Sequence, residues 1–294
     1  MKIATCNEFF ENWNIEDVFR YAAEIGYDGV EIAPFTLATS VREINAERRR
    51  AISRAAEETG VEIVGLHWLL VSPEGLYINH PDDRIRRATQ DYFQELIRFC
   101  GDIGGHVMII GSPKQRSVQP GWSPEMIWDL TRETFYRILP VAEERDVTLC
   151  IEALSADQTN FITTVRDAVR MVEQVDHPNL QTMVDVRSGS REDVPVPELL
   201  RHASPYLRHV HVNDANGRGP SFGSTDFGPI LQTLKDLNYD GYISVEVFDF
   251  TPDPRTIAAK SLGYLQGVLS QLGIRKRQNH ETHPAICKCR SSSS

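Results

Sequence analysis

Short apolar runs recur along this chain at about the spacing of one strand plus one helix, and four of them carry an acidic or imidazole side chain at or next to their end. The four runs are VTLCIE (147–152), LQTMVD (180–185), LRHVHV (207–212) and GYISVE (241–246). They place Glu152, Asp185, His211 and Glu246 at the ends of expected strands. Because the ends of parallel strands in a barrel meet at one rim, the pattern predicts that these four side chains converge.

Eight strand-like runs are each followed by a helical pattern, which is the number of units in an α/β fold of the (β/α)8 TIM barrel type. The strands are nearly continuous in apolar residues, as expected when both faces of a sheet are buried. An open, doubly wound sheet is the alternative, but neither a GxGxxG nor a GxxxxGK[ST] motif follows a strand. The predicted helices are 15–26, 44–60, 82–104, 124–145, 165–175, 196–202, 227–237 and 254–272.

Length and composition favour one catalytic domain over residues 1–272, because 294 residues with 41% hydrophobic content suit a single barrel. Residues 273–294 lack periodicity and end in serines, which predicts a disordered tail. The net charge of −10 argues against nucleic acid and favours a small-molecule substrate. Five cysteines, no signal peptide and no long apolar run predict a cytoplasmic protein without a membrane contact.

Three carboxylates and one imidazole at one rim would repel each other unless a cation lay between them. Taken singly, each residue has a structural alternative, such as a salt-bridged glutamate, a loop-capping aspartate or a hydrogen-bonded core histidine. Taken together they indicate a divalent metal ion, since the strand ends supply no neutralising Lys or Arg. Oxygen-rich ligands with one imidazole favour Mn²⁺, with Mg²⁺, Co²⁺ and Zn²⁺ as alternatives.

Four segments carry a resemblance to a known family: AAEIGYDGVEIAP (22–34), IEALSADQTNFITT (151–164), HVHVNDANGRGPSFGSTDFGPIL (209–231) and SVEVF (244–248). With the order Glu, Asp, His, Glu over strands five to eight, the chain resembles the xylose isomerase-like barrels up to about residue 272. It is most similar to the sugar phosphate isomerase/epimerase branch, which includes ketose 3-epimerases such as D-tagatose 3-epimerase.

The resemblance implies that Glu152, Asp185, His211 and Glu246 hold one divalent ion and that Glu152 and Glu246 also act as the catalytic acid and base. Proton transfer next to a ketone needs a base near the carbon and a Lewis acid that stabilises the enediolate. If the two glutamates face opposite sides of the substrate, the carbon is inverted, as in an epimerase. Proton return to the neighbouring carbon would give aldose–ketose isomerisation instead.

The sequence departs from that branch at positions expected to bind the sugar. Ser188 stands where a histidine is usual, Gln158 where a glutamate is usual, and Gly217 where an arginine is common, with Arg218 beside it. Other residues near the predicted rim offer further contacts, and in the loop GSPKQR both Lys114 and Arg116 are placed to meet phosphate or sugar oxygens unless that loop is merely solvated. The predicted substrate-binding residues are His67, Gln158, Ser188, Arg218, Lys114 and Arg187.

Other functions remain open beside a metal-dependent sugar isomerase or epimerase. A lyase that eliminates a group β to the ketone of a keto-inositol or a 3-oxo-glycoside would use the same base and metal. An abasic-site nuclease similar to endonuclease IV needs extra histidines, one of which is replaced by Ser188, and the acidic charge disfavours DNA. A metal-binding barrel without activity is the last alternative. A homodimer and a homotetramer are both compatible with the sequence.

Overall fold

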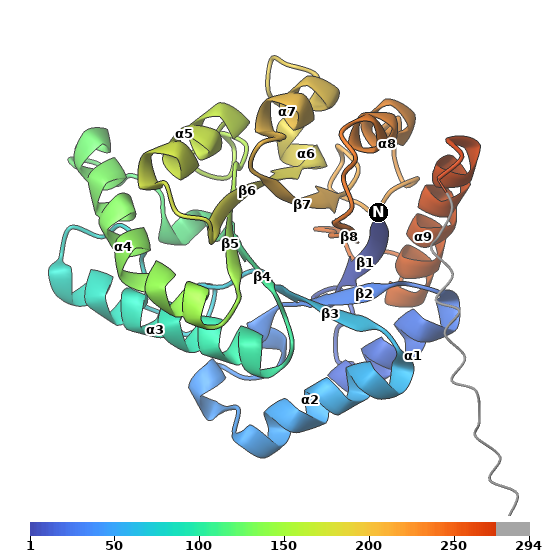
Figure 1. The fold of residues 1–294 in the computed structure, drawn as a ribbon, viewed down its shortest axis with the longest axis horizontal. Helices are drawn as coiled ribbons and strands as arrows, with labels where there is room; N and C mark the ends of the chain where they lie inside the picture. Colours follow the sequence, from blue (N-terminus) through green and yellow to red (C-terminus); the bar gives the residue numbers. More distant parts are fainter. Residues whose placement is uncertain (275–294) are drawn as a thin grey trace, which may run out of the picture.

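The computed structural model describes residues 1–274 and places eight parallel strands in a closed barrel, which confirms the predicted fold (Figure 1). Each strand pairs with its neighbours in chain order, and β1 closes the ring against β8. The strands are β1 (Lys2–Cys6), β2 (Gly29–Ile32), β3 (Glu62–Leu66), β4 (Val107–Ile110), β5 (Thr148–Glu152), β6 (Leu180–Asp185), β7 (Leu207–Val212) and β8 (Tyr242–Val245).

Helices surround the barrel, and the eight predicted helices lie within two residues of the observed ones at each end (Figure 1). These helices are α1 (Ile15–Ile25), α2 (Ala46–Thr59), α3 (Asp83–Asp102), α4 (Pro124–Glu144), α5 (Val165–Val175), α7 (Val196–Ala203), α8 (Phe227–Asp236) and α9 (Pro254–Gln271). Four short elements were not predicted: the 3₁₀ turns η1 (Pro34–Thr36), η2 (Val41–Glu43) and η3 (Pro113–Gln115), and α6 (Val186–Gly189).

Local sequence sets where several helices end. Gly26 and Gly60 follow α1 and α2 in the left-handed region, with φ of 100° and 70°, which glycine adopts without a steric penalty. At the other end of a helix, the side chains of Ser123 and Thr164 accept hydrogen bonds from backbone N–H groups in the first turns of α4 and α5. These signals are local, which explains why the helix limits could be read from the sequence.

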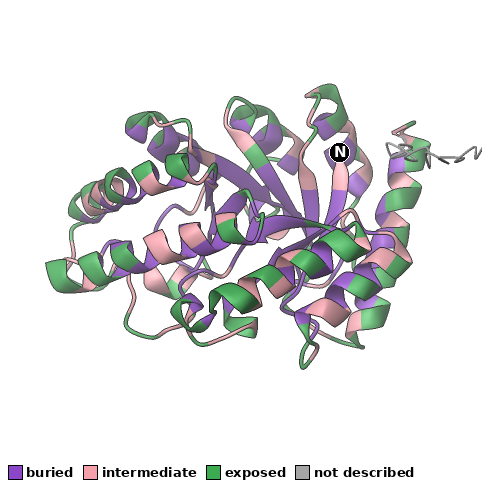
Figure 2. Ribbon diagram, turned by 60° about the horizontal axis from the view of Figure 1, so that its bottom comes forward, coloured by how far each residue is buried: buried purple, intermediate pink, exposed green. Residues whose placement is uncertain are grey.

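The strands are buried along most of their length, whereas each helix is buried only on the side that faces the sheet (Figure 2). The main core lies between sheet and helices and contains fully buried aromatic rings such as Phe19, Phe93 and Phe135. A smaller apolar cluster of Val107, Ile109, Cys150 and Met183 forms a separate group on β4, β5 and β6. The barrel therefore positions the strand ends rigidly at one rim.

The described part of the chain reaches Ile274, so the predicted disordered tail lies, apart from its first two residues, outside the described residues. Within residues 1–274, no helix combines the length and apolar character that crossing a bilayer requires. Cys6, Cys100 and Cys150 are buried free thiols.

Gly65 tests how tightly the barrel wall is packed. A Cβ atom at this position would lie 1.8 Å from the carbonyl oxygen of Val107 on the neighbouring strand. We expect Gly65→Ala to lower the free energy of unfolding by ~3 kcal/mol, because backbone cannot yield as a flexible side chain can. Urea unfolding followed by circular dichroism measures the change.

Gly263 provides the matched control, because it is exposed on α9 and an added Cβ would meet nothing within 4 Å. Gly263→Ala should raise the free energy of unfolding by ~0.5–1 kcal/mol, since alanine favours the helix. Equal stability of the two variants would contradict the close approach of β3 and β4.

Candidate functional site

The structure brings together the four residues predicted at the strand ends. Glu152 and Asp185 are the last residues of β5 and β6, His211 lies near the end of β7, and Glu246 directly follows β8. The strand register pairs Asp185 with His211, so neighbouring strands present these side chains at one level. One potential ligand atom from each of the four lies within 4.8 Å of the others, and all four residues are buried.

Neighbouring groups hold two of these carboxylates in place. Asp185 accepts hydrogen bonds of 2.6 Å from the backbone N–H of Ser188 and of 2.6 Å from the side-chain amide of Asn213. Beside β5, Gly111 leaves the room that the Glu152 carboxylate occupies, because a Cβ atom there would lie 1.8 Å from Glu152 Oε2. The site thus depends on small and polar neighbours that the four strand-end residues do not reveal.

We call the cluster of Glu152, Asp185, His211 and Glu246 the centre, and burial determines its electrostatics. It raises the pKa of Glu152, Asp185 and Glu246, because each carboxylate loses contact with water and lies close to another carboxylate. Burial also acts to lower the pKa of His211, but the carboxylates of Glu246 and Glu31 raise it well above the usual range. The centre therefore has a high affinity for positive charge.

The donor set fits a divalent cation. His211 Nδ1 and Glu246 Oε2 lie 3.0 Å apart, and both are buried atoms without a hydrogen-bond partner. His211 Nδ1 also lies 3.8 Å from Glu152 Oε1. Three carboxylates and one imidazole are ligands that Mn²⁺ and similar ions accept, and a cation among them would relieve the repulsion.

Glu31 lies beside the centre and was not assigned a role from the sequence. Its fully buried carboxylate accepts hydrogen bonds from His209 Nε2 at 2.8 Å and from His211 Nε2 at 3.0 Å. Although burial acts to raise the pKa of Glu31, the two imidazoles hold it well below the usual range. When His211 is neutral, its proton lies on Nε2 toward Glu31, so the lone pair on Nδ1 faces Glu246 and suits a ligand.

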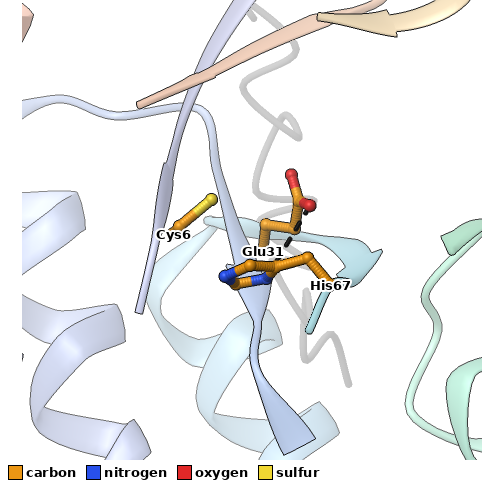
Figure 3. Close-up of side chains that lie close together, drawn as sticks. All are labelled: Cys6, Glu31 and His67. Carbon is orange, nitrogen blue, oxygen red and sulfur yellow. Dashed lines mark ion pairs between the residues drawn. The ribbon is translucent and has the colours of Figure 1, made fainter. Parts of the chain in front are cut away.

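His67 joins Glu31 from the end of β3, and Figure 3 shows the two side chains facing each other near Cys6. His67 Nδ1 lies 3.7 Å from Glu31 Oε1, and His67 Nε2 lies 2.8 Å from Glu8 Oε2. Burial acts to lower the pKa of His67, but the Glu8 carboxylate raises it. A charged residue inside the apolar run GVEIA was the one sequence signal that pointed to Glu31.

A pocket opens above the centre. Glu152, Glu246 and two predicted substrate-binding residues, His67 and Gln158, line it. Ser188, also predicted, lies behind Gln158 and donates a hydrogen bond of 3.2 Å to its side-chain oxygen. The remaining lining residues are Trp68, Ile109, Gly111, Ser112, Pro113, Leu154 and Phe248.

The three predicted cations lie outside this pocket lining. Lys114 is exposed in η3. Arg187 places its guanidinium 5.0 Å from the ring centre of Phe248, with Asp157 at 3.6 Å. Arg218 donates a hydrogen bond of 2.7 Å to the carbonyl of Thr251.

Arg116 corrects an expectation from the sequence. It was placed in a loop to meet phosphate or sugar oxygens, but its side chain is buried and faces the backbone. Its guanidinium donates hydrogen bonds to the carbonyls of Ile110, Glu152 and Ile162 at 3.2, 2.8 and 3.3 Å. Arg116 thus ties the ends of β4 and β5 to the loop that follows β5.

We expect Arg116→Met to lower the free energy of unfolding by ~3 kcal/mol or more, because three buried carbonyls lose their donor. Lys114→Met is the matched control, since Lys114 is exposed two residues away, and its stability should change by less than ~0.5 kcal/mol. Thermal and urea unfolding of both variants decide the point, and a stable Arg116→Met protein would refute this role.

Comparison with known proteins places most of the barrel in one family. A family model described as "Xylose isomerase-like TIM barrel" matches residues 19–268. The fructoselysine 3-epimerase of Shigella flexneri is 25% identical over 267 residues, which cover 87% of this chain and 94% of that protein. The 3-dehydro-D-guloside 4-epimerase of Escherichia coli K12 is 25% identical over 272 residues, which cover 90% of this chain and 99% of that protein.

A solved structure shows the same fold. The crystal structure of D-psicose 3-epimerase with D-tagatose from Clostridium cellulolyticum H10 superposes with a TM-score of 0.82 at 20% sequence identity. The superposition covers 94% of this chain and all of the other.

Proposed function

This chain belongs to the xylose isomerase-like TIM barrel family, and on that premise we propose that it is a divalent-metal-dependent epimerase of keto-sugars. It inverts a carbon next to a ketone. The observation that carries the proposal is that Glu152 and Glu246 both line the pocket while they share one buried cluster with Asp185 and His211. The fructoselysine 3-epimerase and the 3-dehydro-D-guloside 4-epimerase, which both match most of the chain, support this class of reaction.

In this proposal, Glu152, Asp185, His211 and Glu246 hold the metal ion. A bound divalent cation would act as a Lewis acid toward the negative charge that develops on the ketone oxygen. Asp185 takes only the holding role, because its two oxygens already accept hydrogen bonds from Ser188 and Asn213. His211 is oriented by Glu31, so its Nδ1 atom faces the carboxylates.

The two glutamates move the proton. One carboxylate accepts the proton from the carbon next to the ketone, and the other, in its protonated form, returns a proton to the opposite face of the same carbon. Without a metal ion, burial raises the pKa of both carboxylates, so each holds a proton more readily than an exposed glutamate does. The second proton transfer inverts the carbon and leaves the two glutamates with exchanged protonation states.

A panel experiment tests the function. The metal-loaded protein is incubated in D₂O with free ketoses, ketose phosphates, inosose and 3-oxo-glycosides, and deuterium uptake and new products are followed by NMR. We expect uptake at the carbon next to the ketone together with the epimer. Uptake together with loss of a leaving group would replace the epimerase by a lyase, and no uptake from any keto-sugar would refute the proposal.

Metal loading is the next expected result. The protein should bind one equivalent of Mn²⁺, and a chelator should abolish turnover. His211→Ala should weaken Mn²⁺ binding by about 100-fold, since it removes a ligand, and isothermal titration calorimetry measures the change.

Gln158→Ala is the control for metal loading, because Gln158 lines the pocket but is not one of the four clustered residues. It should leave Mn²⁺ affinity unchanged and alter KM. Equal loss of metal in both variants would mean that the ligand assignment is wrong. Three tightly bound zinc ions per chain would instead favour a nuclease-type centre.

Replacing the proton carriers gives a sharper prediction. Glu246→Gln keeps the volume and an oxygen atom but removes the carboxylate that accepts a proton, so turnover should fall by ~10²–10⁴-fold. Glu152→Gln should do the same for the opposite face. In D₂O, each variant should exchange label from one epimer without converting it to the other. Near-native turnover of both variants with metal bound would exclude these glutamates as proton carriers.

A further inference from the structure

We propose that the substrate is an uncharged keto-glycoside with an apolar or aromatic aglycone, and that Trp68 and Phe248 are the residues that select it. This inference rests on the proposed epimerase function and assigns the substrate class of the same site. Two independent features of the pocket carry it: the charge of its lining and the aromatic pair in its wall.

The first feature is the charge of the lining. Among the described residues, no Lys or Arg lines the pocket, whose charged lining groups are the two glutamates of the centre and His67, which is bonded to Glu8. The two other polar side chains of the lining are neutral, namely Ser112 and Gln158. A phosphate or carboxylate on the substrate would therefore lose water without gaining a Lys or Arg partner from the described lining.

Gln158 shows what kind of group the polar side of the pocket accepts. Its side-chain oxygen accepts hydrogen bonds from the hydroxyls of Ser155, at 2.9 Å, and Ser188, at 3.2 Å. Because the two serines use the oxygen, the amide NH₂ group is the part of Gln158 left to contact a ligand. This group donates hydrogen bonds, so it suits a ring oxygen, a glycosidic oxygen or a hydroxyl of a neutral sugar.

The arginines around the rim contact backbone carbonyls, an aromatic ring and a carboxylate. Arg116 donates hydrogen bonds to backbone carbonyls, and Arg218 donates one to the Thr251 carbonyl. Arg187 lies against the Phe248 ring and faces Asp157. None of the three lines the pocket.

The second feature is the aromatic pair. Trp68 and Phe248 both line the pocket, and their rings meet edge to face with centres 6.3 Å apart. Phe248 is 36% exposed although it is a large apolar side chain, so part of its ring is available to a ligand. Leu154 and Pro113 extend this apolar lining.

Trp68 adopts an unusual backbone conformation that keeps its indole in this wall. Its φ of 52° lies in the left-handed region, which residues other than glycine rarely adopt. Such strain persists only where the surrounding structure enforces it, and it concentrates at ligand sites. With their planes 68° apart, the two rings form an apolar corner in the lining of the pocket that contains the two glutamates, and an aryl aglycone can pack against either ring.

The experiment compares substrates that differ only in the aglycone. Turnover of methyl and phenyl 3-oxo-glucosides is measured with the metal-loaded enzyme, beside free fructose and fructose 6-phosphate. We expect kcat/KM to be about tenfold higher for the phenyl than for the methyl glycoside, because the phenyl ring can pack on Trp68 and Phe248. The phosphorylated ketose should be the poorest substrate.

Variants locate the selectivity. Phe248→Ala should bring the phenyl-to-methyl ratio close to one, whereas Phe248→Tyr should keep it. Phe35→Ala is the matched control, because Phe35 is an exposed aromatic residue that follows β2 at the same rim but does not line the pocket. If Phe248→Ala does not fold, Trp68→Asn serves instead, since asparagine tolerates the left-handed conformation.

The outcomes separate this inference from the proposed function. If free fructose or fructose 6-phosphate is turned over faster than the phenyl glycoside, the epimerase stands and the substrate assignment is overturned. A ratio unaffected by Phe248→Ala and Trp68→Asn also overturns it. If no keto-sugar exchanges label, the proposed function itself fails, and calorimetric binding of the two glycosides then decides whether the aromatic pair still selects the phenyl group.

Discussion

Negative charge buried at one rim of the barrel is the constraint on which the site depends. Glu152, Asp185 and Glu246 are almost inaccessible to water, and the fully buried Glu31 adds a fourth carboxylate close by. Charges of one sign cannot share such a space without compensation, because desolvation adds to their repulsion. Three histidines supply part of this compensation. His67, after β3, donates a hydrogen bond to Glu8, and His209 and His211 of β7 donate hydrogen bonds to Glu31.

The histidines do not compensate all the buried carboxylates equally, and this divides the carboxylates into two groups by the direction of their pKa shifts. Glu31 is matched by His209 and His211, and the pKa of Glu31 stays well below the usual range. Glu152 and Glu246 are matched only in part, because the single imidazole of His211 faces both, and burial raises the pKa of each. An ionised group that is fixed by hydrogen bonds suits positioning, whereas a group whose pKa is raised suits proton transfer. The chemistry we propose follows from this difference.

Stability and specificity are supplied by neighbours of the centre. Arg116 joins the carbonyls of β4, β5 and the following loop, so a cation that the sequence placed near substrate is instead part of the framework. Because Arg116 does not line the pocket, the lining is neutral around Gln158 and apolar around Trp68 and Phe248. The acidic centre and the lack of Lys and Arg among the described residues of the pocket lining are therefore two consequences of one arrangement of side chains.

The sequence by itself determined the barrel, the helix limits and the meeting of Glu152, Asp185, His211 and Glu246. The strands and helix limits follow from local periodicity and from helix-capping residues, which act within one strand–helix unit. The meeting of the four side chains follows from the rule that the ends of parallel strands share a rim. Its place after a strand also indicated His67 at the pocket, whereas Gln158 was indicated by the resemblance to the sugar epimerases.

Only the tertiary structure decided what surrounds them. Glu31 and His211 are 180 residues apart, and Arg116 and Glu152 are 36 apart, so no local pattern links them. Whether an arginine meets substrate or a backbone carbonyl depends on which loops pack against it, and this is fixed by closure of the whole barrel. The sequence could place a charged side chain near the rim, but only the packed barrel determined which charged groups are paired with histidines or backbone carbonyls and which face the pocket.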